Sequence, residues 1–464
     1  MDHPGAPEIS PQRGRILAAA GSLLLLALIA SCLASEPRPL FHPPPAGFSA
    51  LAQDIAAFRG LPLKRDIALT SFVDNGAENN AYGPFELKSV ERAYQTIGLL
   101  PANADLGRAL TEFRQLEQLV TYDAAKGSVA VAPGAVKLGA PFAMTDPTLT
   151  REAPLGFAIV AALQEQNFQW QEKINSISLE DRRLAFRALA TGDAALTLIA
   201  RAGDKRTGNL TATDLSGAGR FAAEVEKSAA RLPDFLSQQL GFPYREGSRF
   251  VLWALKAGGW RGVDALYAKA PLSTAEIVHP EKYFLERETP LRFFPAALLR
   301  SMKEAPIVEQ SLGEHAIRGL LAGEINAKHA SEVATRWRGD QLFAFQSGEN
   351  FVTCWFSAWK SASNSAAFHG AYKNVLERRQ RIRFDSKTEP SPNALTGIGR
   401  DGRGVWLESN GPVALWVSGV PTNRLREFAD QAWKDLEIES DPTAIRFDSA
   451  GRWSHGNQWS LRKR

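Results

Sequence analysis

Cysteine is scarce in this chain of 464 residues, which contains only Cys32 and Cys354. If Cys32 is modified, Cys354 has no partner, and no intramolecular disulfide can form. Cys354 lies in the apolar run Phe351–Phe356, which is typical of a buried strand. A catalytic cysteine needs a nearby base and a lowered pKa. We therefore interpret Cys354 as a small core residue.

Motifs for metal and phosphate binding are also missing. The seven histidines show no H-E-x-x-H spacing, and the chain has no glycine-rich phosphate loop, no G-x-S-x-G elbow and no Cys-x-x-Cys pair. His329 with Glu332 is an i, i+3 pair of a kind that is common on solvated helix faces. His279 precedes Pro280, and we expect it to hold a turn through hydrogen bonds. The sequence predicts no cofactor and no metal site.

Charge of one sign is not in large excess, since the formal net charge is +4. The basic residues are dispersed and are not interleaved with aromatic residues, so the pattern predicts no nucleic-acid partner. Apolar residues make up 44% of the chain and charged residues 22%, as in ordinary folded proteins. A chain of this length can bury at least one large core and is expected to contain two domains.

The one long apolar run, residues 16–30, follows Arg13 and Arg15 and is too short for a typical membrane span. It fits the core of a signal peptide, which we assign to residues 1–31. Residues 29–32 resemble a bacterial lipobox, in which Cys32 receives lipid. Residues 32–47 are rich in proline and would form a semi-rigid tether. This predicts an exported protein held at the cell envelope by lipidated Cys32; the alternative is an uncleaved signal anchor.

Residues 152–174 read EAPLGFAIVAALQEQNFQWQEKI. The part from Ala162 to Phe168 resembles the H-E-x-x-H-A-L-Q-D-Q-x-F helix of bacterial, often lipoprotein-like, zinc metallopeptidases of the gluzincin type. In H-E-x-x-H, two histidines one helical turn apart bind zinc, and the glutamate acts as general base. Here those positions hold Phe157, Ala158 and Ala161, none of which can bind a cation or transfer a proton.

The family's second helix reads E-G-D-A and supplies a third ligand from its glutamate. The matching segment is Ala190–Ala194, so Thr191 occupies the ligand position. Further short motifs occur in the family's order and extend the resemblance over roughly residues 55–375. They are Tyr122-Asp123 with Lys126-Gly127, Phe242-Pro243-Tyr244, Gly258-Gly259-Trp260, Ser273–Ile277 and His279–Tyr283. The resemblance thus implies a metallopeptidase-like fold whose zinc-binding and catalytic residues are absent.

Two interpretations of the altered helix remain open. In the first, Phe157 fills the volume of a former zinc cavity, and the segment is an ordinary core helix. In the second, a groove persists and accepts a peptide without cutting it, with Gln164, Asn167 and Asp193 as contacts. Asp193 could equally brace neighbouring backbone.

The periodicity of the chain predicts an α+β protein. A mostly helical, gluzincin-like domain with a small sheet would occupy residues 48–300, a smaller α+β domain residues 301–435, and a polar tail residues 436–464. The main predicted helices are 48–59, 87–98, 103–119, 152–174, 180–201, 214–240, 246–257, 311–322, 327–335, 362–380 and 421–435. The predicted strands are 63–72, a hairpin over 119–131, 341–346, 350–358, 404–409 and 412–418. The C-terminal order suggests two successive ββα units.

Three functional hypotheses follow. The first is a catalytically inactive, metallopeptidase-like lipoprotein that binds a peptide or an envelope protein, or acts as a scaffold. The second is an active hydrolase with unconventional metal ligands, which would require at least three convergent His, Asp, Glu or Cys side chains. In the third, the helical domain is a rigid spacer, and the smaller α+β domain over residues 301–435, the C-terminal module, binds the partner.

Overall fold

The structure is a computed structural model that describes residues 47–70, 84–117, 120–124, 126–131, 147–205, 209–302, 304–347, 350–385, 393–440 and 443–445. The predicted signal peptide, Cys32 and all of the tether except Gly47 lie outside these residues, as does most of the predicted tail. Helices account for 57% and strands for 19% of the structure, which confirms the α+β class. None of the described helices is both long and apolar enough to cross a membrane.

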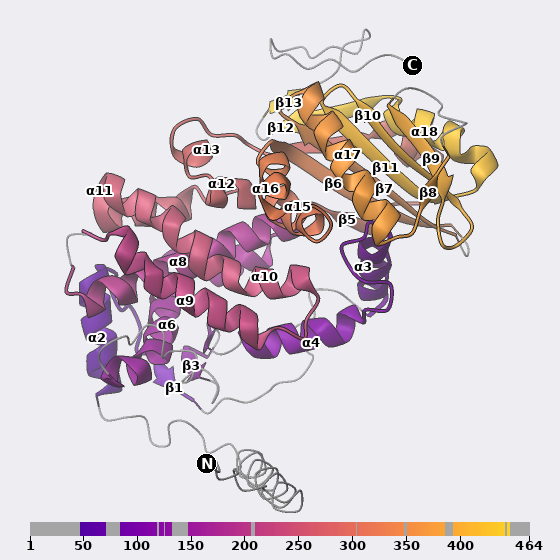
Figure 1. Cartoon of the computed structure of the whole chain (residues 1–464). Coiled ribbons are helices and arrows are strands. Elements are labelled where there is room, and N and C mark those ends of the chain that lie inside the picture. Colours follow the sequence, from indigo (N-terminus) through magenta and orange to yellow (C-terminus); the bar gives the residue numbers. More distant parts are fainter. Residues whose placement is uncertain are drawn as a thin grey trace, which may run out of the picture.

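The first part of the chain is mainly helical and contains a small sheet (Figure 1). Its helices are α2 (Phe48–Arg59), α3 (Pro84–Thr96), α4 (Leu106–Glu117), α6 (Pro147–Phe168), α7 (Trp170–Asn175), α8 (Glu180–Ala202), α9 (Ala212–Ser228), α10 (Asp234–Phe242), the π-helical turn η2 (Pro243–Gly247), α11 (Ser248–Ala268), α12 (Thr274–Val278) and α13 (Glu281–Phe284). Its strands are β1 (Ala68–Leu69), β2 (Val120–Asp123) and β3 (Ser128–Val131), in the sheet order β1-β3-β2.

Three local predictions need correction. Of the strand predicted over 63–72, the described residues 63–70 contain only the two residues of β1. The helix predicted over 214–240 is two helices, because the chain turns after Ser228 and Pro233 precedes α10. The stop expected at Gly258-Gly259 is a kink inside α11, where Gly259 has φ 60° and ψ −158°. Glycine adopts this conformation without steric cost, so the chain changes direction and then continues as helix.

The later part of the chain is rich in sheet. Its strands are β4 (Leu291–Pro295), β5 (Val308–Gln310), β6 (Trp337–Ser347), β7 (Asn350–Trp359), β8 (Arg383–Phe384), β9 (Ala394–Ile398), β10 (Gly404–Asn410), β11 (Val413–Val420), β12 (Leu436–Ser440) and β13 (Thr443–Ile445). Its helices are α14 (Ala296–Ser301), α15 (Gly313–Ala322), α16 (Ala327–Ala334), α17 (Ala362–Arg378), the 3-10 turn η3 (Thr422–Arg424) and α18 (Leu425–Trp433).

The main sheet has the order β5-β6-β7-β11-β10-β9-β8. The strands β6 and β7 followed by α17, and β10 and β11 followed by α18, are the two ββα units in the predicted order, and β7 pairs with β11 at the centre. The two helices cover opposite faces, since α17 packs in one core cluster and α18 in another. Every residue of β10 and β11 is therefore buried, including the polar residues Glu408, Ser409 and Asn410 at the end of β10.

The predicted tail begins too early. Residues 436–440 form β12, which pairs antiparallel with β4 and with β13. Leu436 and Ile438 are buried on the side of α18, so this strand completes the second core cluster. These two apolar residues alternate with acidic ones, which is a pattern that indicates a strand. The polar composition of the whole segment hides this pattern.

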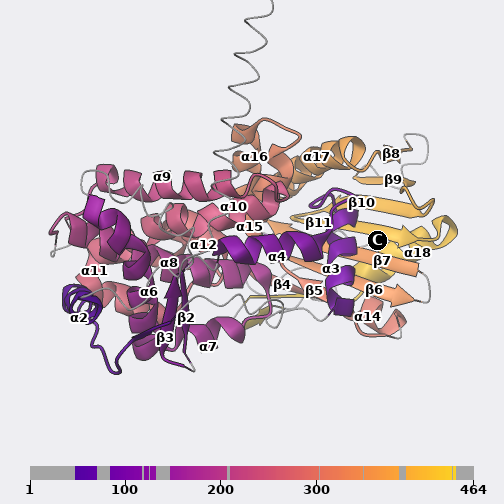
Figure 2. The same cartoon turned by 90° about the horizontal axis from the view of Figure 1, so that it is seen from below.

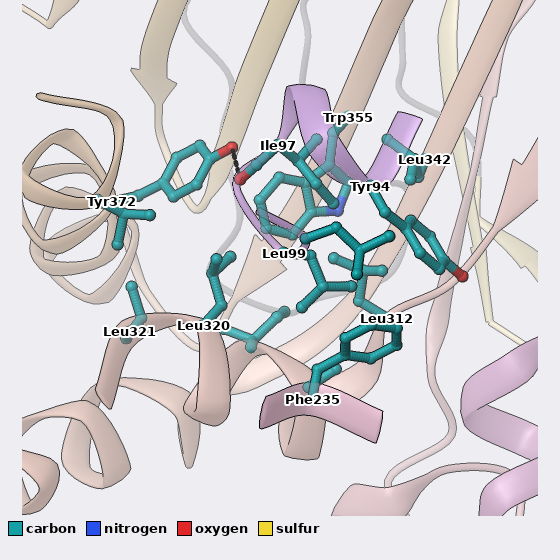
Figure 3. Packing of buried hydrophobic residues seen from close by; sticks show 14 of the residues in the cluster. Tyr94, Ile97, Leu99, Phe235, Leu312, Leu320, Leu321, Leu342, Trp355 and Tyr372 are labelled. Carbon is teal, nitrogen blue, oxygen red and sulfur yellow. Dashed lines mark hydrogen bonds between the residues drawn. The ribbon is translucent and has the colours of Figure 1, made fainter. Parts of the chain in front are cut away.

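The hydrophobic core does not divide at residues 300/301. Helix α3 lies beside the main sheet, far from its sequence neighbour α2, and α4 connects it to the helical part (Figures 1 and 2). Figure 3 shows Tyr94 and Ile97 packed with Trp355 of β7 and Leu342 of β6. The Tyr372 hydroxyl donates a hydrogen bond of 2.9 Å to the Ile97 carbonyl. One core cluster thus joins early and late parts of the chain.

Candidate functional site

The two helices that would carry a zinc site, α6 and α8, lie side by side and antiparallel. The Gln164 amide donates to the Ala190 carbonyl at 2.9 Å, and further along the pair Gly156 faces Leu198. A Cβ on Gly156 would come within 2.5 Å of the Leu198 side chain, so glycine permits this close packing. Glu180 and Asp181 stand in the first turn of α8, where negative charge is favourable to the helix dipole.

Phe157 occupies the first vestigial ligand position and packs against other aromatic residues. Its ring stacks on Phe221 of α9 at a centroid distance of 5.9 Å and meets Tyr244 of η2 edge-on at 5.8 Å. Phe221 and Tyr244 are themselves 4.6 Å apart. These three rings connect α6 to α9 and η2, which lie further along the chain. Stacked and edge-on arrangements at these distances are favourable between aromatic rings.

The other vestigial positions carry little chemistry. Ala158 is fully buried, and Ala161 and Thr191 are half-buried. The Ala161 carbonyl accepts a hydrogen bond of 3.1 Å from the Trp170 indole. Of the four positions, only Thr191 has a side-chain oxygen.

Asp193 is the centre of a buried polar network. Its carboxylate, 0% exposed, accepts hydrogen bonds from Arg59 (Nε to Oδ1, 2.8 Å) and from Tyr267 (Oη to Oδ2, 2.9 Å). Gln164 donates to Oδ2 at 3.2 Å, and Thr197 lies 3.5 Å from Oδ1. A buried carboxylate needs such partners, because leaving it unpaired would cost several kcal/mol.

The electrostatics of this network favour a permanently charged arginine. Burial alone would lower the pKa of the Arg59 guanidinium, but the carboxylates of Asp193 and Asp264 raise it above its ordinary value. The guanidinium also lies over the Trp260 ring, 4.6 Å from its centroid. Burial and the nearby Asp193 charge raise the pKa of Tyr267 well above its ordinary value, so the hydroxyl remains a donor.

These contacts determine what the predicted groove residues do. Gln164 is 1% exposed and Asp193 0%, and both bond to the protein itself. Asn167 is half-buried and donates to the carbonyls of Pro62 and Leu163. The structure brings Gln164 and Asp193 together as internal braces between α2, α6 and α8, and it places neither of them on an open surface.

His279 has a partner that sequence spacing does not reveal. Its Nε2 lies 2.7 Å from Oε1 of Glu314, and Lys282 Nζ lies 3.3 Å from Oε2 of the same carboxylate. Lys282 also donates to the Thr335 carbonyl at 3.1 Å. This cluster connects the turn at His279 to α15 and α16. Within the described parts of the chain, no group of three or more His, Cys, Asp or Glu side chains could hold a metal ion.

The C-terminal module contains a feature that the sequence analysis missed. A hollow of about 760 Å³ lies at the β8 edge of the main sheet, and Arg381, Arg383 and Arg426 line it. The signal was present in the run Glu377–Arg383, which reads ERRQRIR and is the exception to otherwise dispersed basic residues. Arg426 could not have been associated with this run, because it lies on α18, more than forty residues later.

Comparison with known families gives one match, and it covers part of this module. The model described as "Domain of unknown function (DUF8575)" matches residues 303–429, from just before β5 into α18. The chain matches no curated protein and no solved structure. The matched segment contains the seven-stranded sheet and the three arginines of the hollow.

Proposed function

We propose that this protein is a catalytically inactive, metallopeptidase-like lipoprotein that is exported and acts as a binding or scaffolding protein at the cell envelope. The observation that carries the proposal is the packing of Phe157 against Phe221 and Tyr244 at the position where a zinc peptidase has its first histidine. The proposal rests on the resemblance of α6 and α8 to the H-E-x-x-H and E-G-D-A helices.

The chemistry of the substituted positions supports the loss of activity. Catalytic zinc in a peptidase needs three protein ligands and an open fourth position for water. Phenylalanine and alanine offer no lone pair, and a threonine hydroxyl is a poor substitute for a carboxylate. Ala158 also has no group that could accept a proton from water. The rings of Phe157, Phe221 and Tyr244 fill the space beside α6. Their packing takes the place of the stability that a bound metal would give.

Attachment to the membrane would come from lipid on Cys32, with residues 32–47 as the tether. A peptide or an envelope protein would be the partner. Because Gln164 and Asp193 are buried, a partner would bind elsewhere than on these two side chains. The C-terminal module is the alternative location, and the helical part would then be its rigid support through the shared core cluster.

Metal content tests the proposal directly. We expect far less than one zinc per chain by inductively coupled plasma mass spectrometry on protein purified without a histidine tag. We also expect an unchanged thermal midpoint after chelator treatment, because no structural metal would be removed. One tightly held zinc, or zinc-dependent cleavage of denatured casein, would instead favour an active hydrolase with unconventional ligands. Replacing His279 with Gln would then show whether the His279–Glu314 cluster holds the metal.

A further inference from the structure

The hollow lies at the β8 edge of the main sheet, beside the part of the sheet that α18 covers. Arg383 pairs with Ile398, and Thr396 pairs with Trp406, so these four side chains share the α18 face of the sheet. Ile398 pairs on its other side with Gly404, which has no side chain. A Cβ at Gly404 would lie 3.0 Å from a Leu425 methyl group, so glycine lets α18 approach the sheet and form one wall of the hollow.

Three cations from separate elements converge on this hollow. Arg381 lies in the turn after α17, Arg383 on β8 and Arg426 in the first turn of α18. Arg381 has a left-handed backbone conformation, φ 55°, which turns the chain sharply between α17 and β8. All three residues are exposed.

The three guanidinium groups have no counter-charge bound to them within the described part of the chain. None of them makes a hydrogen bond or an ion pair there, whereas neighbouring arginines are engaged. Arg379 bonds Glu324 at 2.8 Å, and Arg400 donates to the Arg379 carbonyl at 2.8 Å. Among the described residues of the lining, Asp385 is the one carboxylate beside these three arginines.

The floor of the hollow is apolar. Ile398 is 58% exposed, which is unusual for a branched aliphatic residue on a folded sheet, and the buried residues Leu425 and Trp406 also line the hollow. A volume of about 760 Å³ falls within the range of roughly 300–1,000 Å³ that small-molecule sites have. Such sites combine an apolar lining with a few polar groups that orient the ligand.

We infer that this hollow binds a small amphipathic anion, with a carboxylate or phosphate group held by Arg381, Arg383 and Arg426. Arginine binds both groups through paired, charge-assisted hydrogen bonds. The apolar body of the ligand would cover Ile398 and the edge of Leu425, which removes that surface from water. The inference depends only on the C-terminal module and is independent of whether the helical part has lost zinc.

Isothermal titration calorimetry with decanoate and with decyl phosphate tests the inference on the full-length protein. We expect binding of at least one of these probes, and the tighter one identifies carboxylate or phosphate as the anionic group. Inorganic phosphate and decanol are the matched controls for head and tail, and each should bind at least about tenfold more weakly than the complete amphiphile. Equal affinity for inorganic phosphate, or no binding of either amphiphile, would refute the inference.

Variants locate the site. Replacing Arg381 and Arg383 together with Gln should weaken binding about tenfold or more, because charge-assisted hydrogen bonds are lost. The control is Arg424→Gln, which removes an exposed arginine near the same end of α18 that pairs with Glu427 and does not line the hollow. Ile398→Ser should weaken the binding of decyl phosphate and leave the weak binding of inorganic phosphate unchanged. Unaltered affinity in the double variant would contradict this site.

Discussion

Arg59, the last residue of α2, and Asp193, in the middle of α8, form an ion pair with both side chains 0% exposed and Nε 2.8 Å from Oδ1. The same two helices share a second pair, Arg201 with Asp54, at 2.7 Å on the surface. The two pairs have nearly equal lengths and differ in burial. Asp193 also accepts hydrogen bonds from Tyr267 and Gln164, so the buried pair belongs to a larger network.

Removing one partner of the buried pair should destabilise the protein strongly. Asp193→Asn leaves the Arg59 charge without its main counter-charge, and we expect a loss of about 3–5 kcal/mol in the free energy of unfolding. Asp54→Asn, the control at the exposed pair, should cost no more than about 1 kcal/mol. Urea denaturation of both variants measures the difference. Similar losses for the two would show that Asp193 is not a structural centre.

The crossing of α8 with η2 should not tolerate a side chain at Gly192. A Cβ there would lie 2.3 Å from the Gly247 carbonyl carbon, so the two elements would have to separate. We expect Gly192→Ala to cost roughly 1–3 kcal/mol, as overpacked sites do. At Gly219 of α9, a Cβ would meet no described atom within 4 Å. Gly219→Ala should therefore stabilise the helix, by about 0.5–1 kcal/mol. Thermal unfolding of the two variants should shift in opposite directions.

Asp340 holds the start of α15 to the main sheet. Its two oxygens accept hydrogen bonds from the indoles of Trp337 and Trp355, at 3.1 and 3.0 Å, and from the backbone N–H groups of Leu312 and Gly313. An asparagine would turn an N–H₂ group toward some of these donors. We expect Asp340→Asn to destabilise the protein by at least about 2 kcal/mol and to change the tryptophan fluorescence of the folded state.

The matched control for Asp340 is Glu309→Gln on β5. Its side chain is 42% exposed and accepts a hydrogen bond from Gln341 at 2.7 Å. This variant should change the free energy of unfolding by no more than about 1 kcal/mol and leave the fluorescence unaltered. A loss at Glu309 as large as that at Asp340 would contradict the anchoring role.

Acid should destabilise the fold through His315. Burial, together with the charges of Arg318 and Arg245, lowers the pKa of His315 from its ordinary 6.5 to about 3. Below pH 6.5 the unfolded chain takes up a proton that the folded protein does not, so stability is present above pH 6.5 and is lost as the pH falls toward 3. The contribution of this one group approaches about 1.4 kcal/mol per pH unit.

Urea denaturation between pH 7 and pH 5 measures the effect. His315→Leu should have a lower stability at pH 7 but a shallower dependence on pH than the unmodified protein. His329→Leu is the control, because His329 is exposed on α16, where its Nδ1 lies 3.6 Å from Oε2 of Glu332. This control should keep the original slope. An equal slope in the His315 variant would refute the assignment.

Local features of the sequence account for much of the fold. Helix α2 has the predicted bounds, and β2 pairs with β3, and β10 with β11 across Asn410-Gly411, as the predicted hairpins require. These elements depend on periodicity and turn chemistry within a few residues. The chemistry missing at Phe157, Ala158 and Ala161 is likewise fixed by residue type, since no arrangement of the chain adds a lone pair to an alkyl or phenyl group.

The tertiary structure alone decided which distant residues meet. The pairing of α3 with the C-terminal sheet, the convergence of Arg59, Gln164 and Tyr267 on Asp193, and the assembly of Arg381, Arg383 and Arg426 all join separate parts of the chain. Periodicity shows that a residue faces a core but does not show which element covers it. That choice depends on the packing and hydrogen bonding of the whole chain, because a buried charge persists only where its partners are brought to it.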